Sequence, residues 1–189
     1  MESLIMVKYF VIHDIHEECG IFGVYGHPEA ANLTYLGLYA LQNRGQEGAG
    51  ICSSDGRRLF LEKSRGLIAD VFNEKRLRRL PGHMSIGHNR YSTAGSSVLK
   101  NVQPIVANFA LGTLAIAHNG NLVNALEVRA ALEDDGAIFQ SSSDSEVIVH
   151  LIAHSKGDDF YERVLHALKQ ISGAFSLLIL REKELIAVR

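Results

Sequence analysis

The chain has 189 residues, of which 47% are hydrophobic and 21% are charged, and its net charge is −2 at pH 7. This composition is typical of one globular domain of ordinary size. No basic or acidic block indicates a nucleic-acid partner or a membrane surface, and no apolar run is long enough to span a bilayer. Two cysteines make no disulfide framework, so we expect a cytoplasmic protein.

Residues 1–18 differ from the rest of the chain. They begin acidic, carry Lys8 inside an apolar run and end in Glu17-Glu18, which is a poor match to a secretory signal peptide. We expect residues 1–18 to be a pro-segment that is removed in front of Cys19. The alternative is an ordinary first strand from Ile5 to Ile12.

The following residues predict short strands and helices. Cys19–Tyr25 is an apolar strand, and Pro28 suits the first turn of a helix that ends near Asn43. Asp55-Gly56 is a hairpin-turn signal. The other elements predicted in this half are a strand after the glycine-rich turn Arg44–Ile51, a strand over Arg58–Glu62, a helix over Asp70–Leu80 and a strand over Met84–His88.

The second half continues with hairpins and with helices in blocks. A strand over Leu114–His118 is predicted to end in a tight turn at Asn119-Gly120-Asn121. Helices are predicted over Ala125–Glu133, Ser145–His154 and Phe160–Ile171, and a final hairpin over Ala174–Leu180 and Glu184–Val188. Because the helices do not follow every strand, the pattern favours an α+β fold with antiparallel sheets over a doubly wound parallel sheet.

Cys19 is the first candidate for chemistry. If residues 1–18 are removed, Cys19 carries a thiol and a free α-amine on one carbon. An α-amine has a pKa of about 7.7–8.0 and can accept a proton near neutral pH. A nucleophile with an N-terminal amine as its base is a known activation scheme. The alternative is a small buried core thiol.

Three polar positions downstream suggest a substrate site. Arg90 lies where a strand gives way to a loop, and arginine can bind a carboxylate with two hydrogen bonds. The Asn119 amide and the Gly120 N–H could converge on one oxygen, as an oxyanion hole requires. Asp144 adds an acid at a helix start. The alternatives are a surface ion pair for Arg90, a plain hairpin turn at Asn119-Gly120 and a helix N-cap at Asp144.

A metal site is not expected. His150 and His154 have the i, i+4 spacing of metal ligands on a helix. They lack the glutamate and the third ligand of a zinc site.

Five motifs occur in one order: Cys19-Gly20-Ile21-Phe22-Gly23, Asn43-Arg44-Gly45-Gln46-Glu47, His88-Asn89-Arg90-Tyr91-Ser92-Thr93-Ala94-Gly95, His118-Asn119-Gly120-Asn121 and Ser143-Asp144-Ser145-Glu146. Together they resemble the glutaminase domain of class II glutamine amidotransferases, which belong to the N-terminal-nucleophile hydrolases. The resemblance runs from Cys19 to the C-terminus. It implies an α+β fold, a four-layer αββα sandwich of two antiparallel sheets, which agrees with the predicted strands.

The resemblance implies catalytic roles for three residues. Cys19 would be the nucleophile, with its own amine as general base. Asn119 and the N–H of Gly120 would form the oxyanion hole.

It also implies how glutamine, the substrate, would be bound. Arg90 would hold the α-carboxylate of glutamine and Asp144 its α-ammonium. Thr93 would be a further substrate-binding residue, within a lid formed by Arg90–Gly95.

Within the family, the motifs favour members in which a phosphoribosyltransferase domain follows the glutaminase domain. In these, ammonia from glutamine converts phosphoribosyl pyrophosphate to phosphoribosylamine in the first step of de novo purine biosynthesis. The alternatives are a domain of the glucosamine-6-phosphate synthase type and a non-catalytic module that retains its pro-segment. We expect residues 19–189 to be truncated before the second domain and to need no cofactor. Magnesium, with an iron–sulfur cluster as a further candidate, would belong to that domain, and the full-length protein would be a homo-oligomer.

Overall fold

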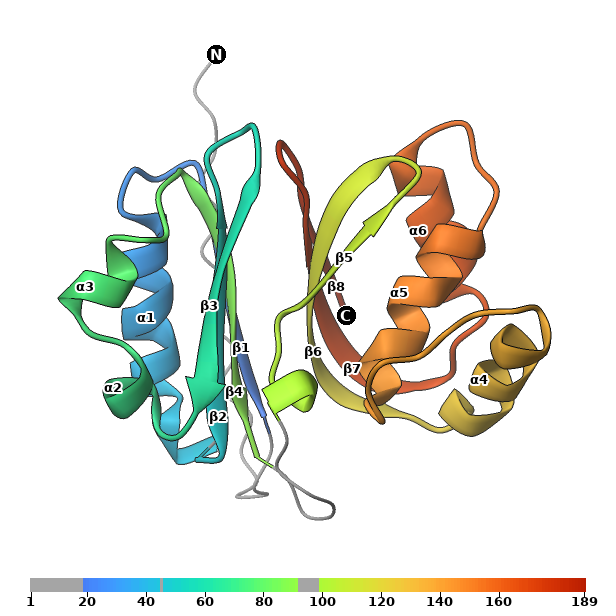
Figure 1. Cartoon of the computed structure of the whole chain (residues 1–189), viewed down its shortest axis with the longest axis horizontal. Coiled ribbons are helices and arrows are strands. Elements are labelled where there is room, and N and C mark those ends of the chain that lie inside the picture. Colours follow the sequence, from blue (N-terminus) through green and yellow to red (C-terminus); the bar gives the residue numbers. More distant parts are fainter. Residues whose placement is uncertain (1–18, 45, 92–98) are drawn as a thin grey trace.

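The computed structural model describes residues 19–44, 46–91 and 99–189. Two four-stranded antiparallel sheets lie face to face, and helices cover the outer side of each sheet (Figure 1). The predicted αββα sandwich is therefore confirmed. The predictions for residues 1–18, both the pro-segment and the alternative strand Ile5–Ile12, and for Thr93 lie outside the described residues.

The first sheet has the strand order β1-β4-β2-β3, and the second has the order β5-β6-β7-β8. The strands of the first sheet are β1 (Gly20–Tyr25), β2 (Gly48–Ser54), β3 (Leu59–Arg65) and β4 (Met84–Arg90). Those of the second sheet are β5 (Ile105–Phe109), β6 (Gly112–Leu122), β7 (Gly173–Leu180) and β8 (Leu185–Val188).

The helices form the two outer layers. On the side of the first sheet lie α1 (Ala30–Ala40), α2 (Ile68–Val71) and α3 (Glu74–Leu77), and on the side of the second sheet lie α4 (Ala125–Asp134), α5 (Asp144–His154) and α6 (Phe160–Leu168) (Figure 1). Two short 3₁₀ turns, Gln42–Arg44 and Leu99–Asn101, complete the described elements.

Alternation along each strand divides the core into layers, because successive side chains point to opposite faces of a sheet. On β6, Leu114 and Ile116 pack against the helices, whereas Ala115 and Ala117 face the first sheet. The space between the sheets is filled by a smaller cluster: Cys52, Met84, Ile86, Ala115, Ala117, Leu178 and Leu180. Cys52 is a fully buried thiol in the middle of β2.

One helix prediction was wrong. Asp70–Leu80 forms no single helix, because α2 ends before Phe72, whose backbone is extended at φ −111° and ψ 133°. The Asn73 side chain then accepts a hydrogen bond from the Arg76 N–H and begins α3. A polar N-cap inside an apolar pattern therefore divides the segment into two short helices.

The turn predicted at Asn119-Gly120-Asn121 was also wrong. These residues lie inside β6 and pair with Ser176, Phe175 and Ala174 of β7. Gly120 has φ +142°, and a Cβ there would lie 2.3 Å from the Ala174 carbonyl oxygen. Glycine is required here for a close approach of two strands, not for a hairpin turn.

Two smaller differences concern element bounds. β5 was not predicted, and β4 runs two residues beyond the predicted strand, so that it ends with Arg90. The predicted hairpin at the C-terminus and the predicted helices α4, α5 and α6 are confirmed within three residues at each end.

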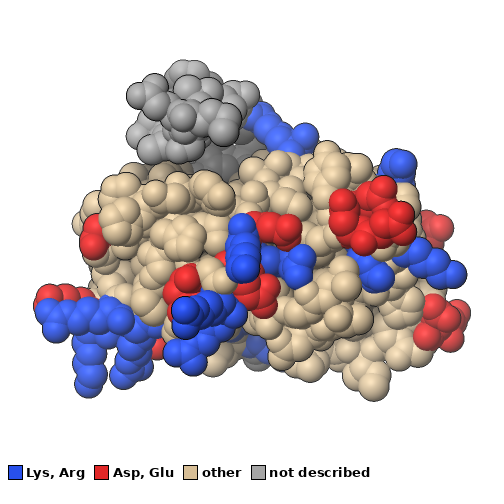
Figure 2. Space-filling model, turned by 90° about the horizontal axis from the view of Figure 1, so that it is seen from above, with Lys and Arg blue, Asp and Glu red and all other residues tan. Residues whose placement is uncertain are grey.

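The outer surface carries charges of both signs. In Figure 2, Lys and Arg side chains lie among Asp and Glu side chains in small groups, separated by uncharged residues. In the part of the chain that the structure describes, no helix is long and apolar enough to cross a membrane.

Candidate active site

Cys19 lies at one end of the first sheet. The next residue, Gly20, begins β1 and pairs with Asn89 of β4, so the chain brings Cys19 beside the end of β4. The Cys19 Sγ lies 3.4 Å from the Tyr91 carbonyl oxygen, to which the thiol donates, and 3.4 Å from the Tyr91 N–H. Cys19 is only partly buried, unlike Cys52. The core-thiol alternative therefore fits Cys52 and not Cys19.

Arg90 is the last residue of β4 and directly precedes Tyr91. Its Nε lies 3.8 Å from Glu47 Oε2, and its carbonyl oxygen accepts a hydrogen bond of 3.0 Å from the Glu47 N–H. The Arg90 side chain is only 15% exposed. The alternative prediction of an ion pair is thus correct, but the pair is not a surface pair, since the guanidinium is held largely inside the protein.

Asp144 is the first residue of α5. Ser143 is the N-cap, because its side chain accepts a hydrogen bond from the Ser145 N–H, so the alternative that Asp144 caps the helix was wrong. The Asp144 Oδ2 accepts a hydrogen bond of 3.3 Å from the Leu122 N–H, at the end of β6. Its Oδ1 lies 3.4 Å from the Ser145 hydroxyl and 3.7 Å from His118 Nδ1. These contacts fix the carboxylate beside the end of β6.

The electrostatics of the thiol connect these residues. Burial raises the pKa of the Cys19 thiol above its usual value, the Tyr91 backbone and the Arg90 charge act to lower this pKa, and the Asp144 charge acts to raise it. The charges of Arg90, at the end of β4, and of Asp144, at the start of α5, therefore act on the same thiol. A thiol with a raised pKa is protonated at neutral pH, so a reaction at its sulfur would need a base.

Asn119 and Gly120 lie near the C-terminal end of β6. Asn119 has the same parity in the strand as Ala115 and Ala117, which face the space between the sheets. Alternation therefore directs its side chain toward the first sheet, which carries Cys19. Leu122, two residues beyond Gly120, donates to Asp144.

The sequence model of the glutamine amidotransferase domain family matches residues 88–189, which is more than half of the chain. The chain belongs to the glutamine amidotransferase domain family. Three of the five sequence motifs, those around Arg90, Asn119 and Asp144, lie within the matched residues.

Known proteins of this family resemble the chain over most of its length. It is 53% identical to amidophosphoribosyltransferase 1, chloroplastic, of Arabidopsis thaliana over 92% of the chain, and 47% identical to amidophosphoribosyltransferase of Bacillus subtilis over 93%. The solved structure of glutamine phosphoribosylpyrophosphate amidotransferase from B. subtilis, complexed with ADP and GMP, superimposes with a TM-score of 0.83 at 45% identity over 88% of the chain. The fold is that of the N-terminal-nucleophile hydrolases.

The chain spans about a third of the length of these relatives: 31% and 37% of the two curated sequences and 36% of the solved structure. The family assignment therefore concerns the glutamine amidotransferase domain. The remaining two thirds of these relatives have no counterpart in the chain.

Metal ligands do not gather in the described part of this family member. Among residues 19–44, 46–91 and 99–189, no group of three or more His, Cys, Asp or Glu side chains could hold a metal ion. His150 Nε2 lies 3.8 Å from Glu146 Oε1, and His154 Nε2 lies 3.1 Å from Asp135 Oδ2. These donors do not fit a magnesium ion, which prefers oxygen ligands, or an iron–sulfur cluster, which is held by thiolates.

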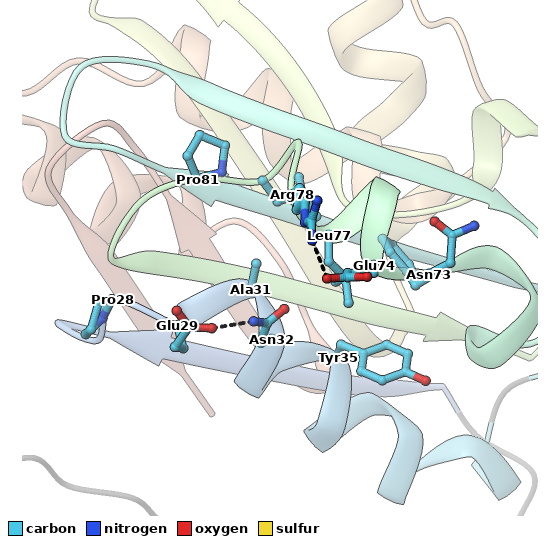
Figure 3. Close-up of a pocket in the computed structure, with 12 residues that line it drawn as sticks. Pro28, Glu29, Ala31, Asn32, Tyr35, Asn73, Glu74, Leu77, Arg78 and Pro81 are labelled. Carbon is cyan, nitrogen blue, oxygen red and sulfur yellow. Dashed lines mark hydrogen bonds and ion pairs between the residues drawn. The ribbon is translucent and has the colours of Figure 1, made fainter.

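A cavity of about 530 Å³ lies elsewhere, between α1 and α3 (Figure 3). In it, Asn32 donates a hydrogen bond to Glu29, and Arg78 pairs with Glu74. Because it opens on the helical side of the first sheet, it is separated by that sheet from the face that carries Cys19. It is not part of the candidate active site.

Sequence reasoning missed a set of buried polar side chains behind the site: Gln103, His118 and Ser145. His118 and Ser145 belong to the quoted motifs and Gln103 lies outside them, and their residue types alone assign no role. The signal is three-dimensional, since each is almost fully buried and hydrogen-bonded to another.

Proposed function

We propose that this domain hydrolyses the side-chain amide of glutamine to glutamate and ammonia, with Cys19 as the nucleophile. The observation that carries the proposal is that Cys19 lies beside the end of β4, which carries Arg90, and that the opposite charges of Arg90 and Asp144 both act on its thiol. A free amino acid presents a carboxylate and an ammonium on one carbon, and these match the two charges. A peptide amide presents neither, so the pair favours glutamine as substrate.

In the proposed reaction, Cys19 is the N-terminal residue and its α-amine takes the thiol proton. The raised pKa of the buried thiol supports the need for such a base. The sulfur attacks the amide carbon of glutamine, and the resulting oxyanion is held by the Asn119 amide and the Gly120 N–H. The amine returns the proton to the leaving nitrogen, ammonia departs, and water hydrolyses the remaining thioester to glutamate.

In the proposed substrate site, Arg90 binds the α-carboxylate and Asp144 the α-ammonium. The Glu47 carboxylate supports this assignment, because it holds the largely buried Arg90 guanidinium in place before a substrate arrives. Thr93 is proposed as a further substrate-binding residue from the motif alone.

In a longer protein of the relatives' kind, we further propose that the ammonia passes to phosphoribosyl pyrophosphate. The support is the name of the relatives, amidophosphoribosyltransferase, together with identities of 47% and 53%. Magnesium and the acceptor site would then belong to residues outside this chain, and the full-length protein would be a homo-oligomer.

The test combines N-terminal sequencing with a glutaminase assay. We expect active protein to begin at Cys19, and a diazo-ketone analogue of glutamine to label Cys19 and spare Cys52. Burial raises the pKa of the Cys52 thiol to about 12, so Cys52 is a matched internal control. Full activity in protein that begins at Met1 would contradict the role of the amine, and labelling of Cys52 alone would contradict the nucleophile.

A further inference from the structure

Gln103 pairs with β6 through its side chain instead of its backbone. The β5–β6 ladder pairs Ile105 with Ile116, and the same register, continued by two residues, places Gln103 opposite His118. There the Gln103 Oε1 accepts a hydrogen bond of 2.7 Å from the His118 N–H, and its Nε2 donates one of 3.2 Å to the His118 carbonyl oxygen. The carboxamide thus makes both bonds of a ladder pair.

The Gln103 backbone has meanwhile left the second sheet. Its carbonyl oxygen would lie 2.2 Å from a Cβ at position 50, so it crosses directly over Gly50 of β2. Gly50 pairs with His88 of β4 in the first sheet. One residue therefore touches both sheets, with its main chain on the first and its side chain on the second.

The same carboxamide also reaches α5. Its Nε2 donates a second hydrogen bond, of 3.1 Å, to the Ser145 hydroxyl. That hydroxyl lies 3.0 Å from His118 Nδ1 and 3.4 Å from Asp144 Oδ1. If Ser145 donates to Asp144, its oxygen accepts from both Gln103 and His118, and every polar atom of the Gln103 carboxamide is satisfied.

These groups are sealed from water. Gln103 is 6% exposed, His118 is 2% exposed and Ser145 is fully buried. His118 Nε2 has no hydrogen-bond partner in the described part of the chain, but the Gln103 carboxamide is fully bonded. A buried carboxamide bonded in this way is held rigidly, because breaking one bond leaves an unpaired polar group in a low dielectric. The network ends one residue before Asn119 on β6 and one residue after Asp144 on α5.

We propose that Gln103 is a positioning residue, which fixes the oxyanion-binding end of β6 relative to the ammonium-binding carboxylate of Asp144. This proposal rests on the proposed function, and it adds the residue that sets the geometry of the glutamine site. The ladder bonds to His118 hold Asn119 and Gly120, and the Ser145 bond holds Asp144. We expect the ladder bonds to His118 to affect kcat and the Ser145 bond to affect the KM for glutamine.

The test compares two variants. Gln103→Met removes the two ladder bonds to His118 and the bond to Ser145, whereas Ser145→Ala removes the hydroxyl contacts with Gln103, His118 and Asp144 but leaves both ladder bonds in place. Gln103→Met should lower kcat at least about tenfold, since a misplacement of about 1 Å costs about a hundredfold. Ser145→Ala should raise the KM for glutamine about three- to tenfold, as expected for one hydrogen bond, and change kcat less than twofold. The matched control is Thr34→Val, which removes a buried hydrogen bond of 2.6 Å to Ser85 on the opposite side of the first sheet.

In an active wild-type protein, this pattern supports the proposal, and any other pattern overturns it. In particular, variants that only lose stability, as Thr34→Val should, would show that Gln103 serves folding alone. If the wild type has no glutaminase activity, the proposed function fails, and amide hydrogen exchange decides the inference. Gln103→Met must then speed exchange both at 118–122 and in the first turn of α5, relative to Thr34→Val; a change at one or neither overturns it.

Discussion

The two ends of the space between the sheets have opposite character, although the same strands line both. On β4, Met84 and Ile86 are fully buried in an apolar cluster, whereas His88 and Arg90, on the same face, are polar. On β6, Ala115 and Ala117 give way to Asn119 in the same manner. Each strand thus passes from the apolar core to the candidate active site.

Along a single strand, the residues that contribute to stability are thus separate from those that contribute to catalysis. Buried apolar side chains stabilise a fold by about 1.5–3 kcal/mol each, whereas buried polar and charged groups cost free energy unless they are paired. We infer that the apolar end stabilises the sandwich and offsets the burial of polar groups at the other. A substitution should therefore change either stability or catalysis, according to the end on which it falls.

The largest effect is expected for Cys19→Ala. Loss of the nucleophile should lower glutaminase turnover at least about a thousandfold, because no other group forms the thioester. The unfolding midpoint in urea should stay within the error of the wild type, since Cys19 is only partly buried. Cys52→Ala is the matched control and should keep full turnover. Residual activity above a tenth in Cys19→Ala would remove Cys19 from the site.

The next largest effect is expected at the apolar end. Ile86→Ala should destabilise the domain by about 2–5 kcal/mol, because it leaves a cavity between the sheets. The kcat/KM per folded molecule should remain within about twofold of the wild type. Urea unfolding and an active-site titration measure the two quantities separately. A large loss of kcat/KM in the folded fraction would show that the two ends are coupled.

The order of strands and helices along the chain predicted antiparallel sheets, and the family resemblance implied the four layers; both are confirmed. The roles of Cys19, Arg90 and Asp144 stay predictions. Sequence reasoning failed where distant partners decide the structure. Asn119-Gly120 has the local signature of a hairpin turn, yet pairing with β7 keeps it extended. Gln103 could not be assigned a role, since its partners are 15 and 42 residues away in the sequence.

A smaller effect is expected at the polar end. Arg90→Ala and Asp144→Asn should each lower kcat/KM for glutamine about ten- to a hundredfold, as expected for loss of a charge-assisted hydrogen bond. Arg65→Ala is a matched control, because Arg65 and Arg90 lie opposite Gly48 on its two sides, and Arg65 is exposed. Steady-state kinetics check this contrast. Equal losses for Arg65 and Arg90 would indicate a general charge effect and not a binding site.

The smallest effect concerns pH and His88, which is fully buried at the polar end. Burial, together with the charges of His118, Arg90 and Lys63, lowers the pKa of His88 from 6.5 to about 3, against a smaller opposite effect of the His118 backbone. Above pH 6.5 the histidine is neutral in both the folded and the unfolded chain. The protonation of His88 therefore takes nothing from the free energy of unfolding in that range. Between pH 6.5 and about 3 only the unfolded chain binds the proton. The free energy of unfolding therefore decreases as the pH is lowered, by at most about 1.4 kcal/mol per pH unit.

Urea unfolding at pH 7, 6 and 5 isolates this contribution when the wild type is compared with His88→Gln and His88→Leu. Both variants should lose less stability between pH 6 and pH 5 than the wild type does, by about 1 kcal/mol. Two different replacements are needed, because each changes packing in its own way but both remove the same proton site. Because Ile86, two residues away on the same face, carries no titratable group, Ile86→Ala should keep the wild-type pH slope despite its larger loss of stability. An unchanged slope in both His88 variants would mean that His88 takes up no excess proton on unfolding, and that the polar end is not maintained at this cost.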